Sequence, residues 1–232
     1  MMADGALWHP SPNFGDRRGG VRPDMVVLHY TAMESCDAAL ERLCAPEHGV
    51  SSHYLIGEDG SLLQLVAEEQ RAWHAGQGAW GPVTDVNSRS IGIELDNRGD
   101  HPFAEVQVAA LESLLSDILE RHAIPPERVI GHSDMAPSRK RDPGPHFPWQ
   151  RLAEQGLSVW PETGAAPELV EATPERLARL TAALTGFGYR GSQATLLFDA
   201  FRQRFRPEAG AFDGTDLAMA EDLALRWPVR PD

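Results

Sequence analysis

The sequence is nearly devoid of lysine. Of its 21 basic residues only Lys140 is a lysine, and 34 acidic residues give a formal net charge of −13. Nucleic-acid-binding proteins need a basic face to displace counterions from phosphates. No lysine-rich tail or arginine stripe occurs here. The composition therefore argues against a nucleic-acid partner.

Long hydrophobic runs are also absent. No apolar run reaches about 18 residues, the length read as a membrane-spanning helix, so we expect no transmembrane segment. The first 20 residues lack the basic-then-apolar pattern of a secretory signal. We therefore expect a cytoplasmic protein, with a periplasmic location as the alternative if an export segment was removed.

Cysteine is scarce as well. Cys36 and Cys44 lie in a segment that is typical of a short helix. Eight residues of helix separate two Cα atoms by about 12 Å, which is too far for a disulfide. We expect two buried, free thiols in a reducing compartment.

The 42% hydrophobic content of these 232 residues can form a sizeable core. Strand patterns occupy residues 24–31 and 88–97 and the RVIGHSD segment, and residues 51–66 indicate a hairpin. Apolar residues recur at three- and four-residue steps over 103–123, which predicts an amphipathic helix. Strands mixed with helices predict an α/β domain over residues 1–162.

The composition changes near the C-terminus. Residues 160–168 are rich in Pro, Gly and Ala, which is typical of a linker. Three short helical patterns follow, at 173–186, 192–205 and 215–227. Residues 163–232 are thus predicted to contain a small three-helix bundle. It has no histidine or cysteine and no obvious chemistry of its own.

Two histidines stand at the ends of apolar strands. His29 interrupts VVLHYT, and His132 follows VIG. An imidazole buried there needs a hydrogen bond or a metal. Asp142 follows in a proline-rich loop, and two imidazoles plus one carboxylate would leave an open position, as in catalytic zinc sites. The chain has no HExxH or CxxC motif, so Asp134 or His146 could take the third place.

A metal hydrolase also needs a proton acceptor and an oxyanion stabiliser. Glu94 lies on the polar face of IGIELDN, opposite Ile93 and Leu95, and is our candidate acid/base. Lys140 lies two residues before Asp142 in a loop expected to be extended, so its ammonium points to the same side as that carboxylate. We therefore interpret Lys140 as the oxyanion stabiliser.

We assign no catalytic or metal-binding role to the following histidines and glutamates. The histidines expected at the surface or at helix ends are His9, His48, His101 and His122. The glutamates expected to be solvated are Glu34, Glu58, Glu68 and Glu69.

Five motifs occur in order over about 135 residues: LHYTA, SSHYLI, AWHAG, IGIELDN and GHSDMAPSRKRDPGPHFPW. Together they closely resemble the type 2 zinc-dependent N-acetylmuramoyl-L-alanine amidases (the AmpD/AmiD-like group), which are related to peptidoglycan recognition proteins. The helical C-terminal part resembles the peptidoglycan-binding domains that some members carry.

The resemblance implies a central mixed β-sheet flanked by helices. It also implies hydrolysis of the amide joining the lactyl group of N-acetylmuramic acid to L-alanine, with peptidoglycan or muropeptides as substrate. By motif, the zinc ligands would be His29, His132 and Asp142, with Glu94 as acid/base and Lys140 as the transition-state partner. Residues expected to contact substrate are His53, Trp73, His74, Asn97 and Arg139.

Two alternative functions compete with the amidase. One is a muropeptide-binding protein without catalytic activity, and the other is a zinc peptidase acting on ordinary peptides. All three expected ligands and both catalytic side chains are present, which favours the amidase.

Overall fold

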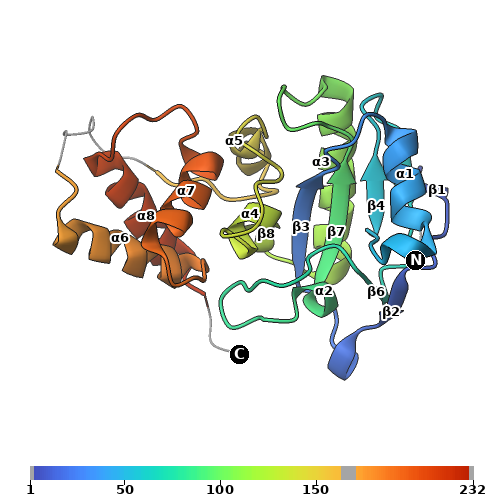
Figure 1. Cartoon of the computed structure of the whole chain (residues 1–232), viewed down its shortest axis with the longest axis horizontal. Helices are drawn as coiled ribbons and strands as arrows, with labels where there is room; N and C mark the ends of the chain where they lie inside the picture. The colour runs from blue at the N-terminus through green and yellow to red at the C-terminus, as the bar shows by residue number, and fades with distance from the viewer. Residues whose placement is uncertain (1–2, 163–170, 230–232) are drawn as a thin grey trace.

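The computed structural model describes residues 3–162 and 171–229. Its centre is a six-stranded sheet in the order β1-β5-β4-β7-β3-β8 (Figure 1). Only the β4–β5 pair is antiparallel, so the sheet is mixed. Strands β2 and β6 form a separate antiparallel pair. The strands are β1 (Leu7–Trp8), β2 (Phe14–Asp16), β3 (Met25–Tyr30), β4 (Tyr54–Ile56), β5 (Leu62–Gln64), β6 (Gln70–Ala72), β7 (Ser90–Leu95) and β8 (Val129–Gly131).

Helices surround this sheet, and the last three form a bundle beyond its β8 edge (Figure 1). The α-helices are α1 (Cys36–Cys44), α2 (Val86–Arg89), α3 (Glu105–His122), α4 (His132–Met135), α5 (Trp149–Glu154), α6 (Pro174–Phe187), α7 (Ala194–Phe205) and α8 (Gly214–Arg226). Short 3-10 helices occupy Arg18–Gly20, Pro46–His48 and Pro126–Arg128.

The predicted α/β class with a mixed sheet flanked by helices is confirmed. The predicted strands, hairpin, long helix and three C-terminal helices all occur. Helix α6 runs one residue beyond the expected end, and Gly188 at φ 149° follows it. His132 begins the short helix α4 directly after β8.

Strand β7 shows how the sequence separates core from site. Its side chains alternate between the two faces of the sheet. Ile91, Ile93 and Leu95 share one buried cluster with the apolar face of α3. The opposite face therefore carries Ser90, Gly92 and Glu94.

The C-terminal bundle shares a core with the sheet. Met25 and Val27 of β3 belong to the same buried cluster as Leu184 of α6 and Phe201 of α7. The bundle thus packs directly on the α/β part. Most of the predicted linker, residues 163–168, lies outside the described residues, and the division at 162/163 stays a prediction.

Two further expectations concern the cysteines and the membrane. Cys36 and Cys44 are both free, as predicted, but each is only half-buried, so the expectation of buried thiols was wrong. Within residues 3–162 and 171–229, no helix combines the length and apolar character that a membrane span requires.

Candidate metal centre and active site

His29 is placed by the central strand of the sheet. It follows Met25 and Val27 on the same face of β3, and it is 1% exposed. The apolar residues before it hold the strand in the core, so the imidazole is fixed near the strand's C-terminal end.

His132 and Asp142 come from one segment that folds back on itself. His132 is the first residue of α4, directly after β8. The backbone N–H of Ser133 donates to the carbonyl of Asp142 at 2.9 Å. This bond brings the loop residue beside the helix start, and Asp142 is 7% exposed.

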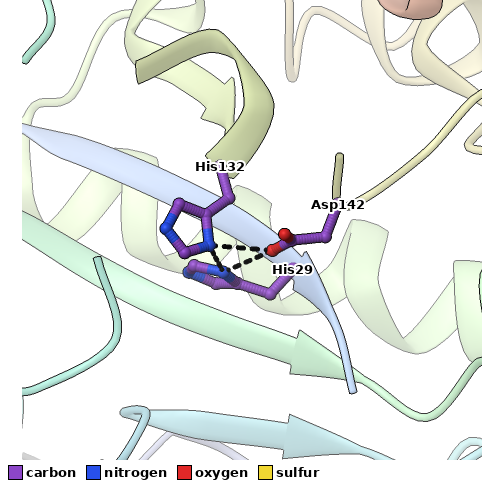
Figure 2. A group of neighbouring side chains, drawn as sticks. All are labelled: His29, His132 and Asp142. Atoms are coloured by element: carbon purple, nitrogen blue, oxygen red, sulfur yellow. Dashed lines mark hydrogen bonds and ion pairs between the residues drawn. The ribbon is translucent and has the colours of Figure 1, made fainter. Parts of the chain in front are cut away.

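The three predicted ligands point toward one another (Figure 2). His29 Nδ1 lies 2.9 Å from His132 Nδ1 and 2.8 Å from Asp142 Oδ2. His132 Nδ1 lies 2.9 Å from the same oxygen. Asp134 and His146, the alternatives for the third place, are not part of this group.

The protonation of His29 follows from a chain of hydrogen bonds. Ser90 Oγ donates its one hydrogen to the carbonyl of Val86 at 2.6 Å, so it accepts from His74 Nε2 at 3.1 Å. The unprotonated Nδ1 of neutral His74 then accepts from His29 Nε2 at 3.0 Å. The Nδ1 of His29 is left with a free lone pair.

The imidazoles of His29 and His74 are both neutral at neutral pH. Burial, and then the neighbouring His132, lower the pKa of His29 to about 4, although Asp142 opposes this. Burial, followed by the nearby His29, lowers the pKa of His74 well below its usual value. The neutral forms required by the hydrogen-bond chain are therefore the stable ones.

His132 is oriented in the same way by a backbone carbonyl. Its Nε2 lies 2.9 Å from the carbonyl oxygen of Ala75, which can only accept, so Nε2 carries the hydrogen. His132 Nδ1 then presents a lone pair, as His29 Nδ1 does. Two lone pairs and a carboxylate oxygen within 2.8–2.9 Å of one another are the donor set of a divalent cation. The residues present fit a metal ion.

Gly92 makes room for His74. A Cβ on Gly92 would lie 2.3 Å from His74 Cγ, closer than real side chains approach. Ser90 and Gly92 of β7 thus hold the ring against the strand. His74 lines the cavity and also supports His29.

Glu94 lies beside the metal group. It pairs in register with His29 on the neighbouring strand. Its Oε2 is buried and accepts no hydrogen bond within the part of the chain that the structure describes. Burial, and then Asp142, raise the pKa of Glu94 well above its usual value, while Lys140 lowers it. A carboxyl group with a raised pKa is suited to accept and return a proton.

The metal group, Glu94 and Lys140 share one cavity of about 450 Å³. Trp73 and Arg139 also line this cavity. Arg139 donates to the carbonyls of Ala75 and Gln77 at 2.8 and 2.5 Å, so it also fixes the AWHAG segment.

Two residues expected to contact substrate lie elsewhere. His53 is fully buried and does not line the cavity. Its Nδ1 accepts from the backbone N–H of Gly92 at 2.9 Å, and its ring lies edge-on to the His74 ring, with 5.8 Å between the ring centres, so it supports β7 and His74. Asn97 is 3% exposed and accepts from the backbone N–H of Gly99 at 2.7 Å, which forms the turn after β7. It does not line the cavity either.

The sequence interpretation missed two features. Arg42 of α1 lines the cavity, but nothing in the sequence links it to the motifs. Glu68, expected to be solvated, is 1% exposed. It accepts hydrogen bonds from Tyr54, Arg121 and His122 at 2.7–2.8 Å, so that prediction was wrong.

Comparison with known proteins decides the class of the chain. Residues 19–145 match the family described as N-acetylmuramoyl-L-alanine amidase. The chain belongs to this family. The matched range contains the whole metal group together with Glu94 and Lys140. The resemblance drawn from the five motifs is confirmed, and the protein is an amidase.

Curated relatives support the same assignment. The chain is 39% identical over 240 residues to the N-acetylmuramoyl-L-alanine amidase AmiD of Escherichia coli K12, covering 89% of this chain and 84% of AmiD. It is 31% identical over 160 residues to the 1,6-anhydro-N-acetylmuramyl-L-alanine amidase AmpD of Enterobacter cloacae, covering 62% of this chain and 86% of AmpD.

Solved structures agree over nearly the whole chain. AmiD from E. coli, in complex with anhydro-N-acetylmuramic acid-L-Ala-D-γ-Glu-L-Lys, superposes with a TM-score of 0.79 at 35% identity and covers 93% of this chain and 98% of AmiD. AmpDh3 from Pseudomonas aeruginosa, in complex with an anhydromuramic pentapeptide, gives a TM-score of 0.76 at 30% identity and covers 99% of each chain.

Proposed function

We propose that the amidase is zinc-dependent and cleaves the amide between the lactyl group of N-acetylmuramic acid and L-alanine in muropeptides. One observation carries the proposal: lone pairs of His29 and His132 and a carboxylate oxygen of Asp142 converge beside Glu94. This is the arrangement of a catalytic zinc site with an open position.

The chain's own side chains have distinct tasks in this reaction. A Zn²⁺ ion held by the three ligands would polarise the amide carbonyl and lower the pKa of water at the site to about 7. Glu94 accepts a proton as the water oxygen bonds to the carbonyl carbon. It returns that proton to the alanine nitrogen as the C–N bond breaks. Lys140 stabilises the negative charge that develops on the carbonyl oxygen.

The charge of the cavity supports an anionic substrate. The protein carries a net charge of −13, yet Arg42, Arg139, Lys140 and Arg141 line this cavity. Stem peptides carry carboxylates, which such a basic wall attracts. The ligands in the AmiD and AmpDh3 complexes are anhydromuramyl peptides with three residues or more. We infer the same substrate class here, with Trp73 and Arg139 as contacts.

The test is product release from anhydro-N-acetylmuramic acid-L-Ala-D-γ-Glu-L-Lys. The zinc-loaded protein should release a peptide with a free L-alanyl amine, a chelator should stop release, and added Zn²⁺ should restore it. A zinc-loaded protein that binds this compound and releases nothing would instead be a binding protein.

Comparing intact sacculi with the soluble peptide distinguishes a cytoplasmic enzyme from an enzyme of the cell wall. We keep the cytoplasmic location as a prediction, with soluble recycled fragments as substrate. Faster release from the soluble anhydromuramyl peptide than from intact sacculi supports this setting. Equal or faster release from sacculi would contradict it and favour an enzyme of the cell wall.

A further inference from the structure

Helix α7 of the bundle contacts the segment that carries two of the three metal ligands. Arg204 donates to Asp134 Oδ2 at 2.6 Å, and Asp134 is two residues after His132. The adjacent Gln203 donates to the backbone carbonyl of Arg141, the residue before Asp142. Consecutive residues of α7 therefore act close to both ligands.

Asp134 caps the N-terminus of α4, the helix that His132 begins. Its Oδ2 accepts from the backbone N–H of Gly131 at 2.8 Å as well as from Arg204. Its Oδ1 accepts from the hydroxyl of Tyr189 at 2.6 Å. The carboxylate is fully buried, and a buried charge needs a paired and hydrogen-bonded partner. Arg204, itself 3% exposed, is that partner.

The same guanidinium also holds the strand that leads into α4. Arg204 Nη2 donates to the carbonyl of Val129 in β8 and to Ser158 Oγ, both at 3.2 Å. The guanidinium carbon lies 4.1 Å from the centre of the Trp149 ring. One side chain therefore contacts both the first residue of β8 and, through Asp134, the first turn of α4, which His132 begins.

We propose that α7 positions the metal ligands. Arg204 acts on His132 through Asp134, and Gln203 acts on Asp142 through the carbonyl of Arg141. The bundle then has a role in the metal centre that is separate from any contact with the cell wall. The inference rests on the proposed zinc site but not on the choice of substrate.

Arg202 offers a matched control on the same helix. It donates to both carboxylate oxygens of Asp216 in α8, at 2.5 and 3.0 Å, and Asp216 is fully buried. This ion pair lies within the bundle. Arg202→Met therefore removes an ion pair inside the bundle, with Arg206 still paired to Asp216 at 2.7 Å, and leaves the contacts to residues 131–142 in place.

The experiment compares the zinc affinities of full-length variants by competition with a chromogenic chelator. All measurements are made at a temperature below the melting temperature of the least stable variant. Arg204→Met should weaken zinc binding about 10-fold, the lower end of the range found when direct hydrogen-bond partners of metal ligands are removed, because Arg204 acts on His132 through Asp134. Arg202→Met should lower the melting temperature but leave zinc affinity unchanged. Wild-type affinity in Arg204→Met, or an equal loss in Arg202→Met, would overturn the proposal.

A double variant separates positioning from folding. Asp134→Asn combined with Arg204→Met leaves no unpaired charge buried, so it should fold even if Arg204→Met does not. It should still bind zinc weakly, because the contacts to Val129 and Ser158 are gone. Wild-type zinc affinity in the double variant would contradict the inference. A wild-type protein that binds zinc but releases no product would refute the proposed function alone.

Discussion

His29 and Glu94 are directly paired residues of the adjacent parallel strands β3 and β7. Paired residues point to the same face of a sheet, so the imidazole and the carboxylate enter the cavity side by side. Strand β7 is also paired with β4 on its other edge. The proposed metal ligand and the proposed proton acceptor are therefore held by the buried centre of the sheet.

Replacing Glu94 with glutamine should abolish most turnover without affecting the metal. The substitution keeps the shape of the side chain but removes the proton acceptor, and loss of such a group typically costs about 10²- to 10⁴-fold in rate. The measurement is kcat on the anhydromuramyl tripeptide together with zinc affinity. The control is Glu58→Gln, because Glu58 is an exposed glutamate in the β4–β5 turn. Near-normal kcat in Glu94→Gln would remove Glu94 from the mechanism.

Replacing Lys140 with alanine should lower kcat about 10²- to 10³-fold, as for the loss of one oxyanion donor. It should also move the acidic limb of kcat/KM to higher pH. Burial and Asp142 raise the pKa of Glu94 and Lys140 lowers it, so loss of the ammonium raises that pKa further. Because the base acts when ionised, activity then appears only at higher pH.

A pH profile of kcat/KM checks the second effect, with Arg141→Ala as the matched control. Arg141 is exposed and lines the cavity, so its removal should mainly raise KM. A pH profile for Lys140→Ala that coincides with wild type would show that the ammonium does not act on Glu94.

His74→Ala should weaken zinc binding about 10- to 100-fold, as expected when the hydrogen-bond partner of a metal-binding histidine is removed. Without His74, the hydrogen bond that keeps Nδ1 of His29 unprotonated is lost. Gly92→Ala should act in the same direction by displacing the ring. Zinc titration measures both, and His101→Ala, outside the cavity, is the control. Unchanged zinc affinity in His74→Ala would limit this histidine to substrate contact.

Glu68 should make stability fall in acid. Burial raises its pKa, but hydrogen bonds from Arg121, His122 and Tyr54 outweigh this, so the folded-state pKa lies below the usual value. A carboxylate with a lowered pKa stabilises the fold at pH values above its unfolded-state pKa. This stabilisation is lost as the pH falls through the folded-state pKa. Glu68→Gln should therefore cost stability at neutral pH, about 1.5–3 kcal/mol for charged hydrogen bonds, and less in acid.

Melting temperatures from pH 7 to 3 test this expectation. The difference between wild type and Glu68→Gln should shrink toward low pH, whereas exposed Glu41→Gln should follow wild type throughout. A constant difference across the range would mean that the Glu68 charge does not contribute.

The parts of the fold set by local patterns were predictable. Alternation in β7 placed Glu94 opposite the core, and strand-end histidines indicated the metal group. The role of Ser90 was not predictable, because it depends on the His74 ring packing over Gly92 from a distant loop. Such contacts leave no local period in the sequence.

Long-range packing explains the other differences. His53 lies in a motif, but its ring is buried between the Gly92 backbone, the His74 ring and Arg17, where it binds the backbone N–H of Gly92. Glu68 resembled a surface residue because its partner Arg121 lies 53 positions later in the chain. The three C-terminal helices were predicted to form a separate small bundle because each is amphipathic, yet Leu184 shares a core with β3.

The central claim is that His29, His132 and Asp142 hold one zinc ion. Anomalous X-ray scattering from zinc-loaded crystals, measured on both sides of the zinc edge, tests it most directly. We expect one peak about 2.0–2.2 Å from both Nδ1 atoms and from an Asp142 carboxylate oxygen. A peak at other residues, no peak, or a signal at the iron edge instead would contradict it.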